Sequence, residues 1–304
     1  CPQMQLCGVA LEPLCLYFPF RKKGLLFSSR LLIMKKIIGL RQVFMKIIDI
    51  HAHIYPDAIA WKAAESIRDY YHIGEKMDGT PKMLLERGTL AGISQYVILP
   101  VAIKPGQVQS INNFVLSQVE THGCFVGFGT VHPGMEDIAD EVTRIRDLGL
   151  RGIKIHPDCQ HFDIDDPRMF PVYEEVGEHL PILMHMGDQR YTYSHPARLR
   201  HVLELFPKLR VCAAHFGGYR MYETASKLLW DKHCIMDISS SLMFMDRGLP
   251  EHYIRRYGAE RMAFGTDYPV WDPVKEVQHF LDLDLTMEQK EQIAWKTASE
   301  FLRL

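Results

Sequence analysis

The sequence has 304 residues, of which 47% are hydrophobic and 24% charged, and its formal net charge at pH 7 is −2. Such a composition excludes an intrinsically disordered chain, a collagen-like repeat and a small disulfide-rich domain. No run of about 18 uninterrupted apolar residues occurs, which argues against a membrane-spanning helix.

Positive and negative charges are unevenly distributed along the chain. Residues 1–44 contain seven basic side chains against one acidic side chain, a net charge of +6, so residues 45–304 carry −8 and all 15 histidines. Nucleic acids and anionic membranes bind clustered Lys and Arg side chains, and the acidic part offers no basic face. We therefore expect a small-molecule partner, with no nucleic acid and no membrane.

The basic segment, residues 1–44, has two interpretations. Its Arg, Lys and Ser content with a single acidic residue is typical of an organellar transit peptide. We favour the other interpretation, translated upstream sequence, because Met45 opens a fresh Met-Lys-Ile-Ile-Asp segment directly before a predicted strand. In both cases we treat residues 1–44 as a leader of doubtful origin and residues 45–304 as one folded domain.

The cysteines after this leader are scattered along the chain and form no Cys-x-x-Cys pair. Single cysteines of this kind act as small apolar residues in proteins from reducing compartments. The pattern therefore predicts a cytoplasmic protein without a disulfide framework.

Eight short apolar segments alternate with amphipathic helical patterns from Lys46 onward. The segments are rich in β-branched and aromatic residues, as strands are. The predicted strands are residues 46–54, 95–102, 125–132, 151–156, 181–185, 210–215, 234–239 and 261–267. The predicted helices are residues 59–70, 81–91, 108–121, 137–148, 196–206, 221–232 and 287–304.

Strands that alternate with helices are parallel and are joined by crossover connections. The first two strand ends lie 49 residues apart with two helical patterns between them, and the later ones follow at intervals of 24–30 residues. This regularity favours a closed (β/α)8 barrel in a single domain over an open doubly wound sheet. A nucleotide-binding fold has little support, because no Gly-x-Gly-x-x-Gly motif follows any predicted strand.

The first predicted strand ends in a His-x-His motif. Period-two alternation turns Asp49, His51 and His53 to one side of the strand. Imidazoles at positions i and i+2 can both bind one metal ion at about 2.1 Å. By itself, however, such a pair is a weak indication of a metal site.

Further strand ends carry potential metal ligands. The fifth strand ends in His185, the sixth in His215 and the eighth in Asp267. In a closed barrel the carboxyl ends of the strands converge on one cup, where catalytic groups are found. Packing alone does not explain three histidine-ending strands and a carboxylate in that cup. The sequence therefore predicts a divalent metal site.

These motifs resemble those of the amidohydrolase superfamily. The resemblance is carried by Asp49-x-His51-x-His53, by His185, by His215 in Ala-His-Phe-Gly-Gly and by Asp267 in Gly-Thr-Asp-Tyr-Pro. The Phe-Pro-Lys-Leu-Arg segment at 206–210 resembles, more narrowly, the amidohydrolase-related branch, which contains aminocarboxymuconate-semialdehyde decarboxylase and related lyases beside many hydrolases. The resemblance spans residues 47–304 and implies a distorted TIM barrel with one or two metal ions.

The resemblance also implies a role for each motif residue. It makes His51, His53, His185 and Asp267 the ligands of one divalent ion, with zinc expected and manganese as the alternative. Zinc lowers the pKa of bound water to about 7, which makes hydroxide available at neutral pH. Asp267 would then accept a proton, and His215 would transfer protons or orient water beside the ion.

Side chains near the metal site are candidates for binding the substrate. Alternation in the fourth strand turns Lys154 and His156 toward the interior. In binuclear members of the superfamily a carboxylated lysine bridges two ions, and Lys154 is the candidate for it; otherwise Lys154 is a buried cation paired with a carboxylate, or a substrate anchor. His156 could contact the substrate or donate to a metal ligand. Arg190 could hold a substrate carboxylate with its guanidinium fork.

The same ligand set is compatible with two enzymatic hypotheses. The first is a metal-dependent hydrolase that uses a metal-activated water on an amide, lactone or ester bond of a small molecule. The alternative is a metal-dependent non-oxidative decarboxylase of a small carboxylic acid. A barrel that binds a ligand without turnover would be expected to lack one of the ligand positions, and all are filled. Trp271 and residues 243–245 could supply a homodimer contact as readily as a wall of the substrate pocket.

Overall fold

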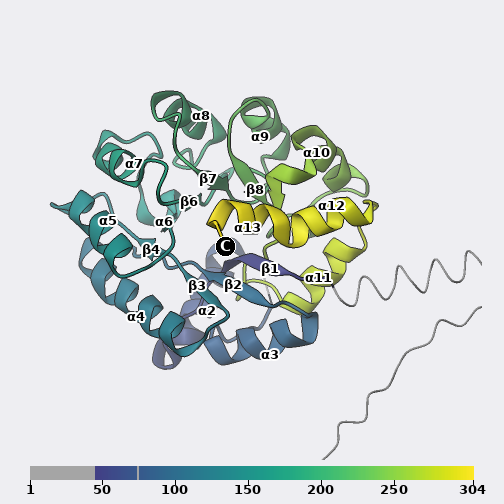
Figure 1. Cartoon of the computed structure of the whole chain (residues 1–304), viewed down its shortest axis with the longest axis horizontal. Coiled ribbons are helices and arrows are strands. Elements are labelled where there is room, and N and C mark those ends of the chain that lie inside the picture. The colour runs from purple at the N-terminus through teal and green to yellow at the C-terminus, as the bar shows by residue number, and fades with distance from the viewer. Residues whose placement is uncertain (1–44, 74) are drawn as a thin grey trace, which may run out of the picture. The chain divides into compact units, whose positions relative to one another are not determined.

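Nine short parallel strands and the helices around them form a barrel in this computed structural model, which describes residues 45–73 and 75–304 (Figure 1). The leader predicted at residues 1–44 lies outside the described residues. The strands are β1 (Ile48–Ala52), β2 (Gln95–Ile98), β3 (Phe125–Gly127), β4 (Gly129–Thr130), β5 (Ile153–Ile155), β6 (Ile182–Met184), β7 (Val211–Ala213), β8 (Ile235–Asp237) and β9 (Met262–Ala263).

The strands follow one another around the barrel in chain order. Hydrogen bonds join each strand to the next in two sheets, one with the order β1-β2-β3 and the other with the order β4-β5-β6-β7-β8-β9. The predicted third strand is divided into β3 and β4 at Phe128, whose N–H donates to the backbone oxygen of Ile98 (3.0 Å). At the other junction the N–H of Ile50 donates to the backbone oxygen of Phe264 (2.9 Å), which closes the ring. The predicted (β/α)8 barrel is therefore confirmed.

Helices surround the strands in Figure 1. As predicted, β1 is followed by two of them, α2 (Asp57–Tyr71) and α3 (Pro81–Ala91). The others are α4 (Val108–Thr121), α5 (Ile138–Asp147), α6 (Pro157–Gln160), α7 (Phe170–Val176), α8 (Pro196–Leu205), α9 (Tyr222–Leu229), α10 (Leu249–Tyr257), α11 (Pro273–Leu281), α12 (Met287–Glu291) and α13 (Thr297–Leu302). No helix in this part of the chain is both long and apolar enough to cross a membrane.

Shorter helical turns complete the connections. The 3-10 turns are η1 (Pro105–Gln107), η2 (Pro167–Met169), η3 (Leu242–Phe244) and η4 (Ala259–Arg261), and a π segment, η5 (Gln292–Lys296), joins α12 to α13. In the described part of the chain, four α-helices begin with a side-chain cap followed by proline, the caps being Thr80, His156, His195 and Asp272. Each cap accepts a hydrogen bond from a backbone N–H of the first turn, which is why these helices begin where they do.

Alternation along the strands separates two apolar clusters. Outward-facing side chains such as Ile153 and Ile155 pack against the helices. Inward-facing side chains such as Leu183 form a second cluster, to which α13 contributes Ala298, Phe301 and Leu302. The inward positions of β5 and β8 instead carry Lys154 and Asp237, both fully buried. Polar side chains therefore share the barrel interior with an apolar cluster.

Candidate metal centre

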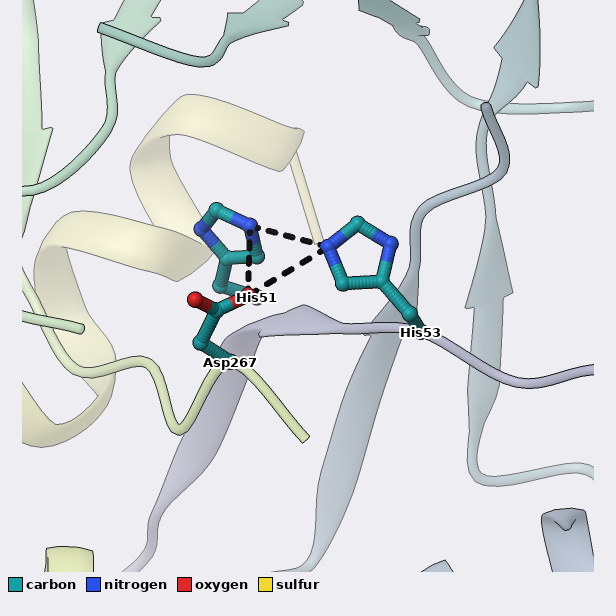
Figure 2. Close-up of side chains that lie close together, drawn as sticks. All are labelled: His51, His53 and Asp267. Carbon is teal, nitrogen blue, oxygen red and sulfur yellow. Dashed lines mark hydrogen bonds and ion pairs between the residues drawn. The ribbon is translucent and has the colours of Figure 1, made fainter. Parts of the chain in front are cut away.

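Two histidines at the end of β1 and an aspartate after β9 form a buried group of potential metal ligands (Figure 2). His51 Nε2 and His53 Nε2 lie 3.2 Å apart, and each lies 3.4 Å from Asp267 Oδ1. Ligand atoms bound at about 2.1 Å with tetrahedral angles lie about 3.4 Å from one another. The three residues therefore fit a divalent ion, and three protein ligands leave a coordination position for water or substrate.

Hydrogen bonds determine which nitrogen of each ring faces this group. His51 Nδ1 lies 2.8 Å from Asp237 Oδ2, and His53 Nδ1 lies 2.6 Å from the backbone oxygen of Leu99. Both partners are acceptors, so Nδ1 carries the proton in each ring and Nε2 keeps its lone pair for a metal ion. Burial lowers the pKa of His51 to about 4, so this ring is neutral at pH 7.

His185 and His215 form a second pair of nitrogen acceptors. His185 Nε2 lies 3.0 Å from the backbone oxygen of Gly187, and His215 Nδ1 lies 3.0 Å from that of Ser239. Because carbonyl oxygens can only accept, the ring protons lie on the nitrogens that face them, His185 Nε2 and His215 Nδ1. The two remaining nitrogens, His185 Nδ1 and His215 Nε2, lie 3.1 Å apart with their lone pairs facing each other. A divalent ion beside these two nitrogens could be bound by both lone pairs, so the pair also fits a metal ion.

The structure thus divides the four predicted ligands into neighbouring sets. His51, His53 and Asp267 lie together, whereas His185 lies outside their group and contacts His215. The ring of His215 stacks on that of His51 with centroids 5.1 Å apart, so the two sets are adjacent.

Two further side chains orient Asp267. Its Oδ2 accepts a hydrogen bond from Ser240, and Ser240 Oγ accepts one from Trp271 Nε1 (2.8 Å). This arrangement leaves Oδ1 for the side that His51 and His53 face. Burial raises the pKa of Asp267, but the positive charge that the neighbouring histidines carry when protonated lowers it by more, so the net shift is downward. The carboxylate is therefore ionised.

Lys154 is fully buried beside the same group. Its Nζ lies 3.2 Å from His51 Nε2, and no carboxylate oxygen in residues 45–73 and 75–304 forms an ion pair with it. Burial lowers the pKa of this amine to about 8. The structure does not show the predicted ion pair between Lys154 and a carboxylate of the barrel. Bridging two ions and anchoring a substrate are both compatible with its position.

Comparison with known proteins identifies the family. Residues 48–304 match the family model described as amidohydrolase. The chain belongs to the amidohydrolase family. The predicted superfamily and the prediction of an enzyme are thereby confirmed.

Solved structures share the barrel of this amidohydrolase. A TIM-barrel protein from Bordetella bronchiseptica is 21% identical, with a TM-score of 0.73 over 85% of this chain and 99% of that one. The dihydroxybenzoic acid decarboxylase of Polaromonas sp. JS666, with bound manganese and 2-nitroresorcinol, is 15% identical, with a TM-score of 0.68 over 86% and 98%. The 5-carboxyvanillate decarboxylase of Sphingomonas paucimobilis is 15% identical, with a TM-score of 0.65 over 86% and 99%. At these identities the likeness establishes the fold alone.

The predicted substrate-binding residues of the amidohydrolase occupy different surroundings. Lys154 reaches the metal-ligand group, and His156 stacks on His185 with ring centroids 3.9 Å apart. The guanidinium of Arg190 is not free to bind a substrate carboxylate, because its Nε and Nη2 donate to the two carboxylate oxygens of Asp188 at 3.0 and 2.7 Å. The carboxylate two residues earlier in the chain occupies the fork that was expected to bind the substrate.

Sequence reasoning missed the groups that orient the ligands. Asp237 is the last residue of β8 and faces the barrel interior. The expectation that polar residues at the carboxyl ends of strands converge, which identified His185 and His215, could therefore have identified Asp237 as well. Leu99 and Gly187 act through backbone oxygens, which every residue has and which give no sequence signal.

Asp49 differs from the predicted arrangement. It was expected to face the same side as His51 and His53. Instead its carboxylate accepts hydrogen bonds from Thr266 Oγ1 (2.6 Å) and from the backbone N–H of His51 (3.0 Å). The pairing register of β1 shifts between Asp49 and Ala52, which interrupts the simple alternation. Asp49 therefore ties β1 to the segment after β9.

Proposed function

We propose that this amidohydrolase is a metal-dependent enzyme that removes the carboxyl group of a small carboxylic acid without oxidation. The observation that carries the proposal is Lys154, a buried amine 3.2 Å from the metal-facing nitrogen of His51 and unpaired with any carboxylate of the described residues. The likeness of the barrel to two decarboxylases supports the same reaction class.

An anion would be favoured between Lys154 and an ion held by His51, His53 and Asp267. Two positive charges in a buried site repel each other strongly, because the local dielectric constant is low. The carboxylate of a substrate placed between them would accept hydrogen bonds from Lys154 Nζ and relieve this repulsion. A neutral substrate would not relieve this repulsion.

The residues of the chain have distinct tasks in such a reaction. The ion, when bound, stabilises the negative charge that develops on the substrate as carbon dioxide leaves. Lys154 holds the carboxylate, and the nearly complete burial of His51 and His53 keeps bulk water away. Asp267 and His215, the predicted catalytic residues, are the groups that can hold the proton that replaces the carboxyl group.

We propose one ion per chain, either zinc or manganese. Histidine nitrogens with one carboxylate are a common donor set for zinc. The carboxylate also suits manganese, the ion bound in the decarboxylase of Polaromonas sp. JS666.

Release of carbon dioxide tests this proposal. Metal-loaded protein is incubated with a panel of small hydroxybenzoic acids, and carbon dioxide is measured against the acid consumed. We expect stoichiometric release from at least one acid and loss of release in His51→Ala. The exposed His252→Ala is the control and should retain activity. Cleavage of an ester or amide panel without any release of carbon dioxide would refute decarboxylation.

Hydrolysis is the second candidate, and the Lys154 amine is also the observation that favours it. Carboxylation would convert this amine into an anion able to bridge two ions, so no substrate carboxylate would be needed. Elemental analysis of protein purified without chelator tests this bridging form. About two ions per chain supports a bridging Lys154 and hydrolysis of an amide, lactone or ester, whereas about one leaves Lys154 free to hold a substrate carboxylate.

A further inference from the structure

His156 has the opposite hydrogen-bonding polarity to the four metal-facing histidines, His51, His53, His185 and His215. The backbone N–H of Cys159 donates to His156 Nδ1 (3.3 Å), so this nitrogen holds a lone pair and the proton of the neutral ring lies on Nε2. His156 Nε2 lies 3.2 Å from the hydroxyl of Tyr71. The other four rings present acceptors, whereas His156 presents a donor.

This polarity argues against a metal ion among His156, Asp158 and His185, although their side chains lie close together. The two rings are stacked with an interplanar angle of 9°, so an ion in the plane of one ring lies out of the plane of the other. The Nε2 atoms of both rings carry protons, and the carboxylate of Asp158 accepts a hydrogen bond from Ser194. His156 Nε2 instead faces the Tyr71 hydroxyl and lies 3.6 Å from Cys159 Sγ.

Tyr71, the last residue of α2, is held in place by Arg190. The guanidinium lies over the rings of Tyr70 and Tyr71, 4.4 and 5.2 Å from their centroids, and Arg190 Nη1 donates to the backbone oxygen of Tyr70 (2.7 Å). Across the described ranges the Tyr71 hydroxyl makes one hydrogen bond, which it accepts from His156. Its own proton is therefore free to be donated.

We propose that His156 and Tyr71 act as a donor pair for an anionic oxygen of the substrate, in which the imidazole Nε2–H donates to the Tyr71 hydroxyl and the phenol O–H donates to the substrate. The inference rests on the proposed function, in which Lys154 and the ion take the carboxyl group that is removed. The donor pair takes a second acidic oxygen of the same molecule. Burial holds the pKa of Tyr71 well above its ordinary value, so the hydroxyl remains a donor at neutral pH.

A row of aromatic rings connects this donor pair with the metal-facing histidines. Edge-to-face contacts link Tyr71 to Tyr219 (5.7 Å), Tyr219 to Phe244 (5.7 Å) and Phe244 to Trp271 (5.8 Å). The ring of Tyr219 also lies 6.0 Å from that of His215. Rings in this arrangement pack well against a planar molecule. Aromatic acids are therefore the appropriate probes for the donor pair.

Direct titration with benzoate and isophthalate tests the inference, because the two probes differ only by a second carboxylate. We expect the metal-loaded wild type to bind isophthalate about tenfold more tightly than benzoate, the effect of one hydrogen bond to a charged group. Tyr71→Phe should lose this preference. The matched control Tyr70→Phe removes the hydroxyl of the neighbouring ring and should keep it.

A second variant separates substrate binding from metal binding. His156→Ala should lose the preference for isophthalate and retain the ion content of the wild type. Loss of the ion from this variant would identify His156 as a ligand and overturn the inference. An equal preference in wild type and Tyr71→Phe, or none in the wild type, would also overturn it. Because binding is measured without turnover, a retained preference without carbon dioxide release would count against the proposed reaction alone.

Discussion

In the histidines of this site, the hydrogen-bond partner of one ring nitrogen determines whether the other nitrogen is a donor or an acceptor. In each of the four metal-facing histidines a carboxylate or a carbonyl oxygen fixes one proton, and the second nitrogen is left as an acceptor. In His156 a backbone donor reverses the ring. Residue type alone therefore does not separate a metal ligand from a hydrogen-bond donor.

Asp237 provides a test of this argument that leaves every ligand in place. In Asp237→Asn the amide can donate to His51 Nδ1, which favours the tautomer with its proton on Nε2 and blocks the nitrogen that faces the ion. We expect the affinity for zinc or manganese to fall about 10- to 100-fold. Competition with a chelator of known affinity measures the change.

The same substitution at an exposed aspartate is the control for this measurement. Asp246→Asn should leave the affinity unchanged, because this side chain is exposed and outside the site. If Asp237→Asn binds the ion as tightly as the wild type, then the hydrogen bond from His51 does not govern metal binding.

The sequence predicted ligand residues better than it predicted their partners. Strand ends identify side chains that converge, and His51, His53 and Asp267 do converge. Arg190 was assigned to the substrate, but Asp188 lies within reach of its guanidinium and occupies it. Local pairing of this kind depends on loop conformation, which a single sequence does not determine.

At the scale of elements, the segments after the strands position the site through unusual backbone conformations. His215, Ser240 and Asp267 have φ values of 59°, 48° and 58°, in the left-handed region that non-glycine residues seldom adopt. Asp237 helps to hold two of these segments, because its Oδ1 accepts from the backbone N–H groups of His215 and Ser239 at 3.1 Å each. Periodicity predicts the strands but not these turns, since the stabilising partner comes from a different strand.

The predicted third strand shows a related limit of sequence reasoning. Its apolar run is continuous, yet the structure divides it into β3 and β4. A Cβ atom on Gly127 would lie 2.7 Å from a methyl group of Val119, and one on Gly129 would lie 2.6 Å from Ile145. These glycines allow α4 and α5 to approach the strand closely. Such close approach is a tertiary property that the apolar pattern does not report.

An ion pair between helices allows a prediction at this scale. Arg87 of α3 bonds both carboxylate oxygens of Asp272, the buried cap of α11, with Nε 2.9 Å from Oδ1. Burial raises the pKa of Asp272, but the hydrogen bonds from Arg87 lower it by a larger amount, so the net shift is downward. Asp272→Asn keeps a capping side chain and removes the charge. We expect it to lower the free energy of unfolding at pH 7 by about 1–3 kcal/mol.

The effect of pH has a definite sign for this pair. A depressed carboxyl pKa in the folded state stabilises the protein above the ordinary pKa of about 4, and that contribution is lost as the pH falls. Denaturant unfolding of wild type and Asp272→Asn should therefore give a difference that is constant near pH 7 and shrinks below about pH 4. A difference independent of pH would show that the charge of Asp272 is not its source.

At the scale of the whole molecule, closure of the barrel creates the site. The metal-facing atoms come from β1 and from the segments after β6, β7 and β9, which lie far apart in the sequence. They converge only when all the strands are paired in order. The unfolded chain therefore offers no comparable site, and metal binding is coupled to folding.

Removal of the ion should consequently destabilise the entire barrel. An ion that binds only the folded state adds about 2.7 kcal/mol to the free energy of unfolding when its free concentration is 100 times its Kd. We expect a chelator to lower the Tm by several degrees and zinc or manganese to restore it in proportion to the logarithm of the free ion concentration. His53→Ala, which lacks one ligand, should respond much less to the same additions. A wild type with the same Tm before and after verified removal of the ion would contradict a metal centre that the fold assembles.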